Sequence, residues 1–232
     1  GNLLALDAER VYIYSNTLQA IAVGYLLTVP MVLYLKPWQQ VAALLLLLLV
    51  YSFPMHMYGD WSAQGNFAAM VDKTVLGRFR DGSVVAADGS VQFALWYDYT
   101  WLWSSLTFCC TVSFGSLAGY LTKNSNVAHP LVAKKLLLMG VLLVALGAFL
   151  GIWQPVVKRI WTASFTLYSA GWCYLLLAFF YWWIDVKGHT KGVGWLLCFG
   201  CNAITAYLIG EIVNFRGVAD SLLYGTAQYL DG

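Results

Sequence analysis

Residues 37–54 read PWQQVAALLLLLLVYSFP, an apolar run that holds six consecutive leucines between two prolines. A helix needs roughly 20 mainly apolar residues to cross a bilayer core about 30 Å thick. Because this run is apolar on every side, it predicts a helix in lipid or in a bundle interior. Comparable runs recur at about residues 17–35, 99–121, 131–153, 162–184 and 193–213. We therefore expect an all-α polytopic membrane protein, a bundle of about six transmembrane helices that forms a single domain over residues 1–232.

The composition favours the same class. Hydrophobic residues make up 60% of the chain and charged residues only 10%, whereas soluble proteins have about 25% charged residues. The mean hydropathy is +0.67. A net charge of +2 without any basic block excludes a nucleic-acid partner. The lipid bilayer is the expected surrounding.

The start of the chain and its cysteines give weaker indications of the protein's class. The chain begins with Gly1 and has no signal-peptide pattern before its first apolar run, so we expect a piece of a longer protein or a processed one. All five cysteines fall inside apolar runs. Cys198 and Cys201 share one face of the expected helix, where cysteine behaves as a small apolar residue. The spacing of the cysteines does not indicate a disulfide framework or a metal cluster.

One long polar connection, residues 59–98, separates the second run from the third. Apolar residues recur at helical spacing within residues 67–76, which predicts a short amphipathic helix at the membrane interface. Asp81-Gly82 and Asp88-Gly89 indicate turns around a small β-hairpin. Long loops follow the positive-inside rule weakly, so we leave the cations of this connection out of the charge count. The remaining lysines and arginines favour the side with Lys123 and Lys135 as cytoplasmic. We therefore expect the long connection to be an extracytoplasmic loop.

Two pairs of glycines have the spacing that allows helices to approach closely in lipid. They are Gly115 with Gly119 and Gly147 with Gly151. We expect both pairs to form packing seams between helices.

Residues 155–165, PVVKRIWTASF, place two cations, a tryptophan and two hydroxyl residues just ahead of an apolar run. Two interpretations fit. The segment is an interfacial loop whose cations meet headgroups and whose tryptophan joins the aromatic belt, or it is a site that binds an anion and donates hydrogen bonds.

This segment also resembles the C-terminal half of the heparan-α-glucosaminide N-acetyltransferase family and its bacterial relatives. Two further stretches of that half match in order, Ile184-Asp185-Val-Lys187-Gly188 and Gly200-Cys-Asn202-Ala-Ile. Upstream, residues 70–77, Tyr97-Asp98 with the later Gly115 and Gly119, and Leu18-Gln19 are similar to the family as well. The resemblance covers most of the chain and implies a bacterial inner membrane protein.

The chain departs from the family's pattern at several places. The family has arginines around the Leu-Gln pair, where this chain has Ile13 and Ala20, and it follows Tyr-Asp with Pro-Glu-Gly, where this chain has residues 99–101, YTW. The family's proposed catalytic histidine lies in an N-terminal membrane segment that has no counterpart here. The family also adds a last helix after the tail.

The resemblance implies acyl transfer across a membrane, with acetyl-CoA as the cytoplasmic co-substrate and an extracytoplasmic sugar or glycan as the acceptor. Such chemistry needs a base for the acceptor proton, donors for the oxyanion, and cations for the CoA phosphates. The residues implied at the transfer site are Lys158, Trp161, Ser164 and Asn202. Those implied for acceptor binding are Asp72, Asp98 and Gln19. Those implied for CoA are Lys123, Lys134, Lys135 and Lys187.

Other interpretations stay open from the residues alone. Asn202 fits a hydrogen bond between two helices as well as a site, Glu211 fits a pair with Arg216, and His56 is the fallback base on the acceptor side. A homodimer is one expected assembly. The alternative function is a non-catalytic membrane module or half of a transporter, since a helical bundle with a polar residue in mid-membrane has the same composition.

Overall fold

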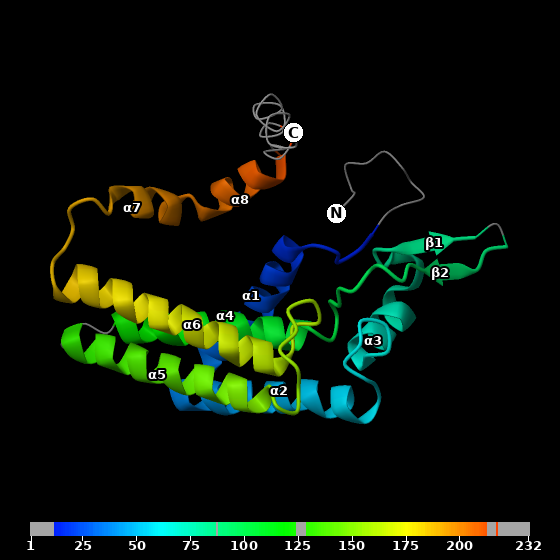
Figure 1. Ribbon diagram of the computed structural model, residues 1–232, viewed down its shortest axis with the longest axis horizontal. Coiled ribbons are helices and arrows are strands. Elements are labelled where there is room, and N and C mark those ends of the chain that lie inside the picture. Colours follow the sequence, from blue (N-terminus) through cyan, green and yellow to red (C-terminus); the bar gives the residue numbers. More distant parts are fainter. Residues whose placement is uncertain (1–11, 87, 124–128, 213–216, 218–232) are drawn as a thin grey trace, which may run out of the picture. The chain divides into compact units, whose positions relative to one another are not determined.

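The computed structural model describes residues 12–86, 88–123, 129–212 and 217, and over these residues the protein is mostly helical. The chain divides into two compact units, Gly1–Val186 and Lys187–Gly232. The α-helices of the first unit are α1 (Thr17–Tyr34), α2 (Pro37–Met57), α3 (Phe67–Leu76), α4 (Ser105–Lys123), α5 (His129–Leu150) and α6 (Ala163–Tyr181), and those of the second are α7 (Gly194–Cys201) and α8 (Ala203–Ile212) (Figure 1).

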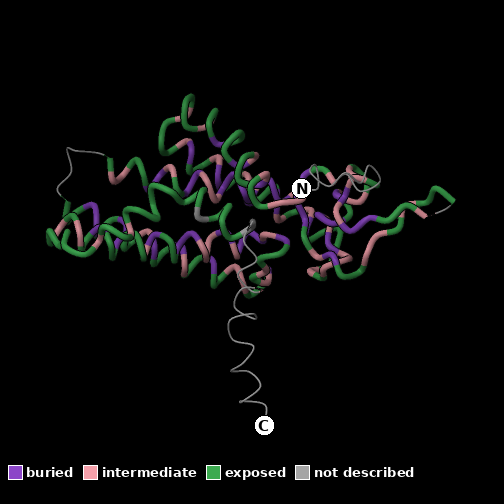
Figure 2. The backbone as a smooth tube through the Cα atoms, turned by 90° about the horizontal axis from the view of Figure 1, so that it is seen from above, coloured by how far each residue is buried: buried purple, intermediate pink, exposed green. Residues whose placement is uncertain are grey.

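The first unit is built around α4. This helix packs against α1, α2, α5 and α6, and its Thr107, Cys109, Cys110 and Ser113 are all buried. Buried residues follow the facing sides of the long helices, whereas the outward sides are exposed (Figure 2). The prediction of a mainly helical fold is confirmed for this part of the chain.

Within the described ranges, four helices are long and apolar enough to cross a membrane: α1, α2, α5, and α6 together with the π-helical turn Trp182–Val186 that continues it. In α2, Leu44 and Leu48 are buried, while Leu45 and Leu49 are 57% and 67% exposed. An outward face of leucines would be unfavourable in water and is favourable in lipid. The four helices therefore indicate an integral membrane protein.

Local sequence signals set the helix starts. At α1, the Asn16 side chain accepts from the Gln19 backbone while the Gln19 side chain accepts from the Asn16 backbone, a capping box. Pro37 is the first residue of α2, as suits a residue without a backbone N–H. Thr162 caps α6. Helix α4 begins at Ser105 and not near residue 99 as predicted. The residues before it form a turn, in which the backbone amides of Trp101 and Leu102 donate to the Asp72 carboxylate.

Close packing of α5 on α6 depends on glycines, but only partly on the predicted ones. A Cβ at Gly147 would lie 2.5 Å from the Tyr168 nitrogen, and one at Gly171 would lie 2.5 Å from the Val144 nitrogen. The prediction was wrong for Gly115 and Gly119. Both are exposed with nothing near their Cβ positions, because α4 turns the opposite face, with Phe114 and its neighbours, to the bundle.

The long connection folds as predicted. Helix α3 is present, and strands β1 (Ser83–Val85) and β2 (Val91–Phe93) pair antiparallel with Val84 opposite Gln92. The hairpin projects from α3 (Figure 1). Gly82 adopts φ +77° beside Tyr97, a backbone conformation that favours glycine.

The second unit corrects the prediction of one helix over residues 193–213. Asn202 separates α7 from α8. Its backbone amide donates to the Cys198 and Phe199 carbonyls at 3.2 Å, and its side-chain amide donates to the Cys198 carbonyl at 2.9 Å. Each piece is too short to cross a bilayer alone. Cys198 and Cys201 are free and exposed on α7.

The bundle of the first unit has two ends, named here for their residues. The loop end holds α3, the hairpin, and residues 151–162 between α5 and α6. The lysine end holds the end of α1, the start of α2, the end of α4 and the start of α5, with Lys36, Lys123, Lys134 and Lys135. His129 at the start of α5 bonds Tyr181 at 2.6 Å, which joins α5 to the end of α6 there.

Candidate functional site

Segments that are distant in sequence meet at the Ile160 carbonyl, at the loop end. It accepts from the Tyr51 hydroxyl of α2 at 2.7 Å and from the Ser104 hydroxyl at 3.1 Å. The Arg159 carbonyl next to it accepts from the Thr100 amide at 3.4 Å. Residues 155–165 are therefore a junction of α2, α4 and α6, and the loop end is the candidate site.

Ser164 lies inside this junction and is fully buried. Its hydroxyl donates to the Pro155 carbonyl at 3.1 Å and lies 3.0 Å from the Thr162 hydroxyl. Thr162 in turn accepts from the Val157 and Phe165 amides. The structure therefore places Ser164 in the cap that fixes the turn before α6, without a path to a substrate.

Trp161 is half-buried and adopts φ +49°. A bulky residue in the left-handed region is strained, and such residues are over-represented at functional sites. Its indole nitrogen donates to the Thr111 hydroxyl at 3.1 Å, and its ring packs edge-on against Phe108 and Phe165. Surrounding contacts hold the strained backbone in place.

The neighbouring cations Lys158 and Arg159 differ in their contacts. Lys158 is exposed, and among the described residues nothing hydrogen-bonds or pairs with its ammonium. Arg159 forms an ion pair with the carboxylate of Asp98. Of the residues implied for transfer and acceptor binding, Lys158 is therefore exposed, whereas Asp98 is held by its ion pair with Arg159.

Asp72 of α3 is fully buried. Its two carboxylate oxygens accept from the Trp101 amide at 2.8 Å and the Leu102 amide at 2.9 Å. Burial raises the pKa of this carboxyl to about 6, although both hydrogen bonds and the nearby charge of Arg80 act to lower it. A carboxyl that titrates near neutrality is common at functional sites, but this one first serves to hold the turn before α4.

Arg80 is fully buried next to Asp72 and has unusually few partners. Its guanidinium lies over the Tyr97 ring at 4.9 Å, and one nitrogen donates to the Tyr97 carbonyl at 3.5 Å. The other two side-chain nitrogens have no hydrogen-bond acceptor. Burial lowers the pKa of the guanidinium below its usual range. Orphaned buried donors of this kind are costly and call for an explanation.

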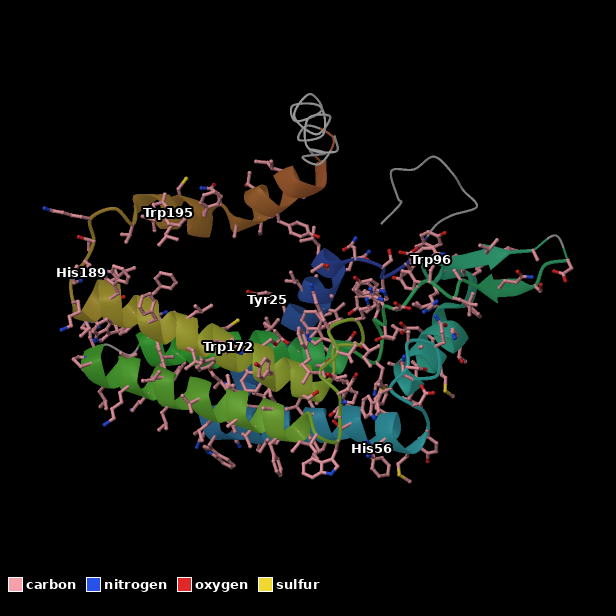
Figure 3. The ribbon with its side chains drawn as sticks, in the orientation of Figure 1. Tyr25, His56, Trp96, Trp172, His189 and Trp195 are labelled. Atoms are coloured by element: carbon pink, nitrogen blue, oxygen red, sulfur yellow. The ribbon has the colours of Figure 1, made fainter. Side chains whose placement is uncertain are left out.

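An aromatic chain connects this buried pair with the bundle. The Trp101 indole donates to the Tyr97 hydroxyl at 2.8 Å, and the Tyr14 hydroxyl lies 2.7 Å from that of Ser105. Trp101 also packs near Phe108, the neighbour of Trp161. Trp96, by contrast, is 74% exposed at the base of the hairpin (Figure 3).

Three other predicted residues take no part in the junction. Gln19 is occupied in the capping box of α1. Asn202 belongs to the second unit, where it caps α7 and is exposed. His56, the fallback base, is exposed at the end of α2 and packs edge-on against Trp61 (Figure 3). Glu211 and Arg216 lie outside the residues whose side chains are described.

Three of the four residues implied for CoA binding lie at the lysine end of the bundle. Lys123 ends α4, and Lys134 and Lys135 lie near the start of α5; all three are exposed. Lys187 is exposed in the second unit. Lys134 also lines a groove of about 460 Å³ between α5 and α6.

Sequence reasoning missed Arg80 and Tyr51. Arg80 is one of several cations in the long connection, and no pattern in the sequence distinguishes it from the others. Tyr51 read as part of a uniformly apolar helix, although a tyrosine hydroxyl in such a run needs a buried partner.

The fold and the hydroxyl-rich junction define a helical integral membrane protein with polar contacts concentrated at one end of its bundle. No family model, curated protein or solved structure matches the chain.

Proposed function

We propose that the chain is the C-terminal part of a membrane-bound acyltransferase similar to heparan-α-glucosaminide N-acetyltransferases. In this proposal, cytoplasmic acetyl-CoA supplies the acetyl group and an extracytoplasmic sugar accepts it through an amine or hydroxyl. The observation that carries the proposal is the division of polar groups between the ends of one bundle. Exposed lysines lie at one end, and Lys158 with the Asp98–Arg159 pair lies at the other.

This division suits a reaction with substrates on opposite sides of a membrane. The lysine end is cytoplasmic in the proposal, and Lys123 and Lys135 bind phosphates of CoA. The loop end is extracytoplasmic. The five long helices of the first unit cross the bilayer, and α7 with α8 makes the sixth crossing as a helix interrupted at Asn202.

The contacts at the loop end suggest separate roles. Lys158 is the cation that is free to approach the oxygen of a tetrahedral intermediate, where negative charge develops. It also lies just ahead of α6, whose N-terminal dipole favours an anion. Trp161 and Ser164 are positioning residues, since their polar atoms are committed to the turn that presents Lys158. Asp98 binds the acceptor together with Arg159, and the proton-accepting base comes from outside this chain.

The test is acetyl transfer by the complete protein that carries this chain. Lys158→Gln should lower turnover by about 10² to 10³, the usual effect of losing one oxyanion donor. Lys158→Arg should be impaired as well, because a guanidinium does not reproduce a compact ammonium. Arg159→Gln removes a neighbouring cation that pairs with Asp98, so it should weaken acceptor binding more than it lowers turnover. If Lys158→Gln keeps more than about a third of wild-type turnover, residues 155–165 are an interface anchor.

The break at Asn202 favours a second candidate function, half of a transporter. Transporters place interrupted membrane helices at substrate sites. That candidate is distinguished by CoA release: a complete protein that moves a solute but releases no CoA with any glucosamine acceptor is not the proposed acyltransferase.

A further inference from the structure

A groove on the outer face of the α5–α6 pair lies at the lysine end of the bundle. Eight of its nine lining residues are apolar, and Lys134 is the exception. Its floor holds two small buried residues, Ala133 and Ala178, whereas Leu137 and Phe179 beside them are 52% and 45% exposed. The groove is therefore a recess in a surface that lies within two candidate membrane spans.

The groove follows from how α5 and α6 pack. Between Gly147 and Gly140 the helices are in close contact, and a Cβ at Gly140 would lie 2.8 Å from the Leu175 side chain. Beyond that point no further glycine of α5 brings the helices together, and α6 widens into the π-helical turn Trp182–Val186. The bond between His129 and Tyr181 keeps the helix ends joined. The recess is thus preformed, and π-helical turns are frequent at functional sites.

A hydrocarbon chain fits this lining better than other occupants. The walls offer no hydrogen-bonding side chain apart from Lys134 and the indole of Trp182. The amides of a pantetheine arm would lose hydrogen bonds to water there without replacement, a cost of about 1–3 kcal/mol each. A lipid tail has no polar atoms to lose and reaches the groove sideways from the bilayer.

The charge at the groove selects the head group. Lys134 is five residues into α5, which places its Cα roughly 8 Å below the helix start. A lysine at that depth extends its ammonium toward the interface. A cation above an apolar recess between helices is the arrangement that binds anionic lipid head groups.

We propose that this groove binds one acyl chain of an anionic phospholipid, whose phosphate pairs with Lys134. Lys135 does not line the groove and contributes only general attraction at the surface. The proposal does not depend on the acyltransferase function.

The experiment is native mass spectrometry of the purified chain, titrated with phosphatidylglycerol or phosphatidylcholine of identical acyl chains. The wild-type chain should retain phosphatidylglycerol about tenfold better than phosphatidylcholine. Lys134→Gln should abolish this preference, and Lys135→Gln, which removes the same charge one residue away, should keep it. Absence of a preference in the wild-type chain overturns the proposal without any variant.

A second pair of variants tests the acyl chain. Leu137→Trp adds bulk to the groove wall and should weaken retention of both lipids, whereas Leu138→Trp on the adjoining lipid-facing surface should not. Both leucines are exposed, so neither substitution disturbs the core. Equal losses for Lys134→Gln and Lys135→Gln indicate diffuse surface charge and overturn the site. Displacement of the lipid by glycerol phosphate or by CoA at similar concentration also overturns it, since the acyl chain would then contribute nothing.

Discussion

The carboxylate of Asp72 in α3 accepts a hydrogen bond of 2.8 Å from the backbone amide of Trp101, 29 residues later. The Leu102 amide bonds the other oxygen. A carboxylate from the long connection thus satisfies donors ahead of α4 that the helix itself cannot satisfy. This contact fixes the start of the central helix to the loop end.

Asp72→Asn should destabilise the protein by about 1–3 kcal/mol. One carboxylate oxygen becomes an NH₂ group, which cannot accept from a backbone amide and leaves a buried donor unpaired. Chemical denaturation in detergent, followed by far-UV circular dichroism, measures the change. Asp88→Asn is the control, because Asp88 makes similar bonds to Ser90 in an exposed turn. A loss no larger than that of the control would contradict the role of Asp72 as a cap.

The free energy of unfolding should fall as pH rises from about 4 to about 6. The pKa of Asp72 is about 6 in the fold against 3.8 as its reference value, so the folded protein binds more protons than the unfolded chain in this range. Ionisation of the buried carboxyl then removes up to about 3 kcal/mol, at about 1.36 kcal/mol per pKa unit. The difference between wild type and Asp72→Asn isolates this term from the histidines. A flat difference from pH 4 to 7 would disprove it.

Arg80→Met should leave the stability of the fold nearly unchanged at pH 5 and should lower it at pH 8. At pH 5 Asp72 is mostly neutral, and the substitution removes a buried cation with two unpaired donors. At pH 8 it removes the charge that helps Asp72 to ionise. Thermal unfolding at both values checks the reversal. Arg78→Met, at an exposed arginine two residues away, should show no comparable difference between the two pH values.

Gly147→Ala should lower the free energy of unfolding by more than about 2 kcal/mol. Gly115→Ala should change it by less than about 0.5 kcal/mol. The added Cβ at Gly147 would meet the backbone of Tyr168 at 2.5 Å, and backbone cannot move aside as a flexible side chain does. At Gly115 the added methyl group meets open space, and alanine is the better helix former in solution. Unfolding of the two variants in the same detergent gives the comparison. Similar losses would mean that α4 also packs through its glycines.

Much of the fold was predictable because its signals are local. The apolar run from Pro37 forms most of α2, Asn16 and Gln19 mark the start of α1, and two Asp-Gly pairs frame the hairpin. The candidate site was less predictable. Residues 155–165 were predicted to be an interfacial loop or an anion-binding site, and only the structure shows that the Ile160 carbonyl joins α2 to the turn before α4. Ser164, however, turned out to be committed to a cap, and no pattern distinguished Arg80 from an ordinary loop cation.

The sequence by itself determined that this is a helical membrane protein and where most of its helices begin, because apolar length and capping residues act within a few positions of the chain. Only the tertiary structure decided which glycines form the seam, that Asn202 interrupts a helix, and that Asp72 is buried while Lys158 is exposed. These outcomes depend on which face of each helix meets another segment. That choice is made by packing between residues that lie far apart in sequence, as with Gly147 and Tyr168, and no local spacing encodes it.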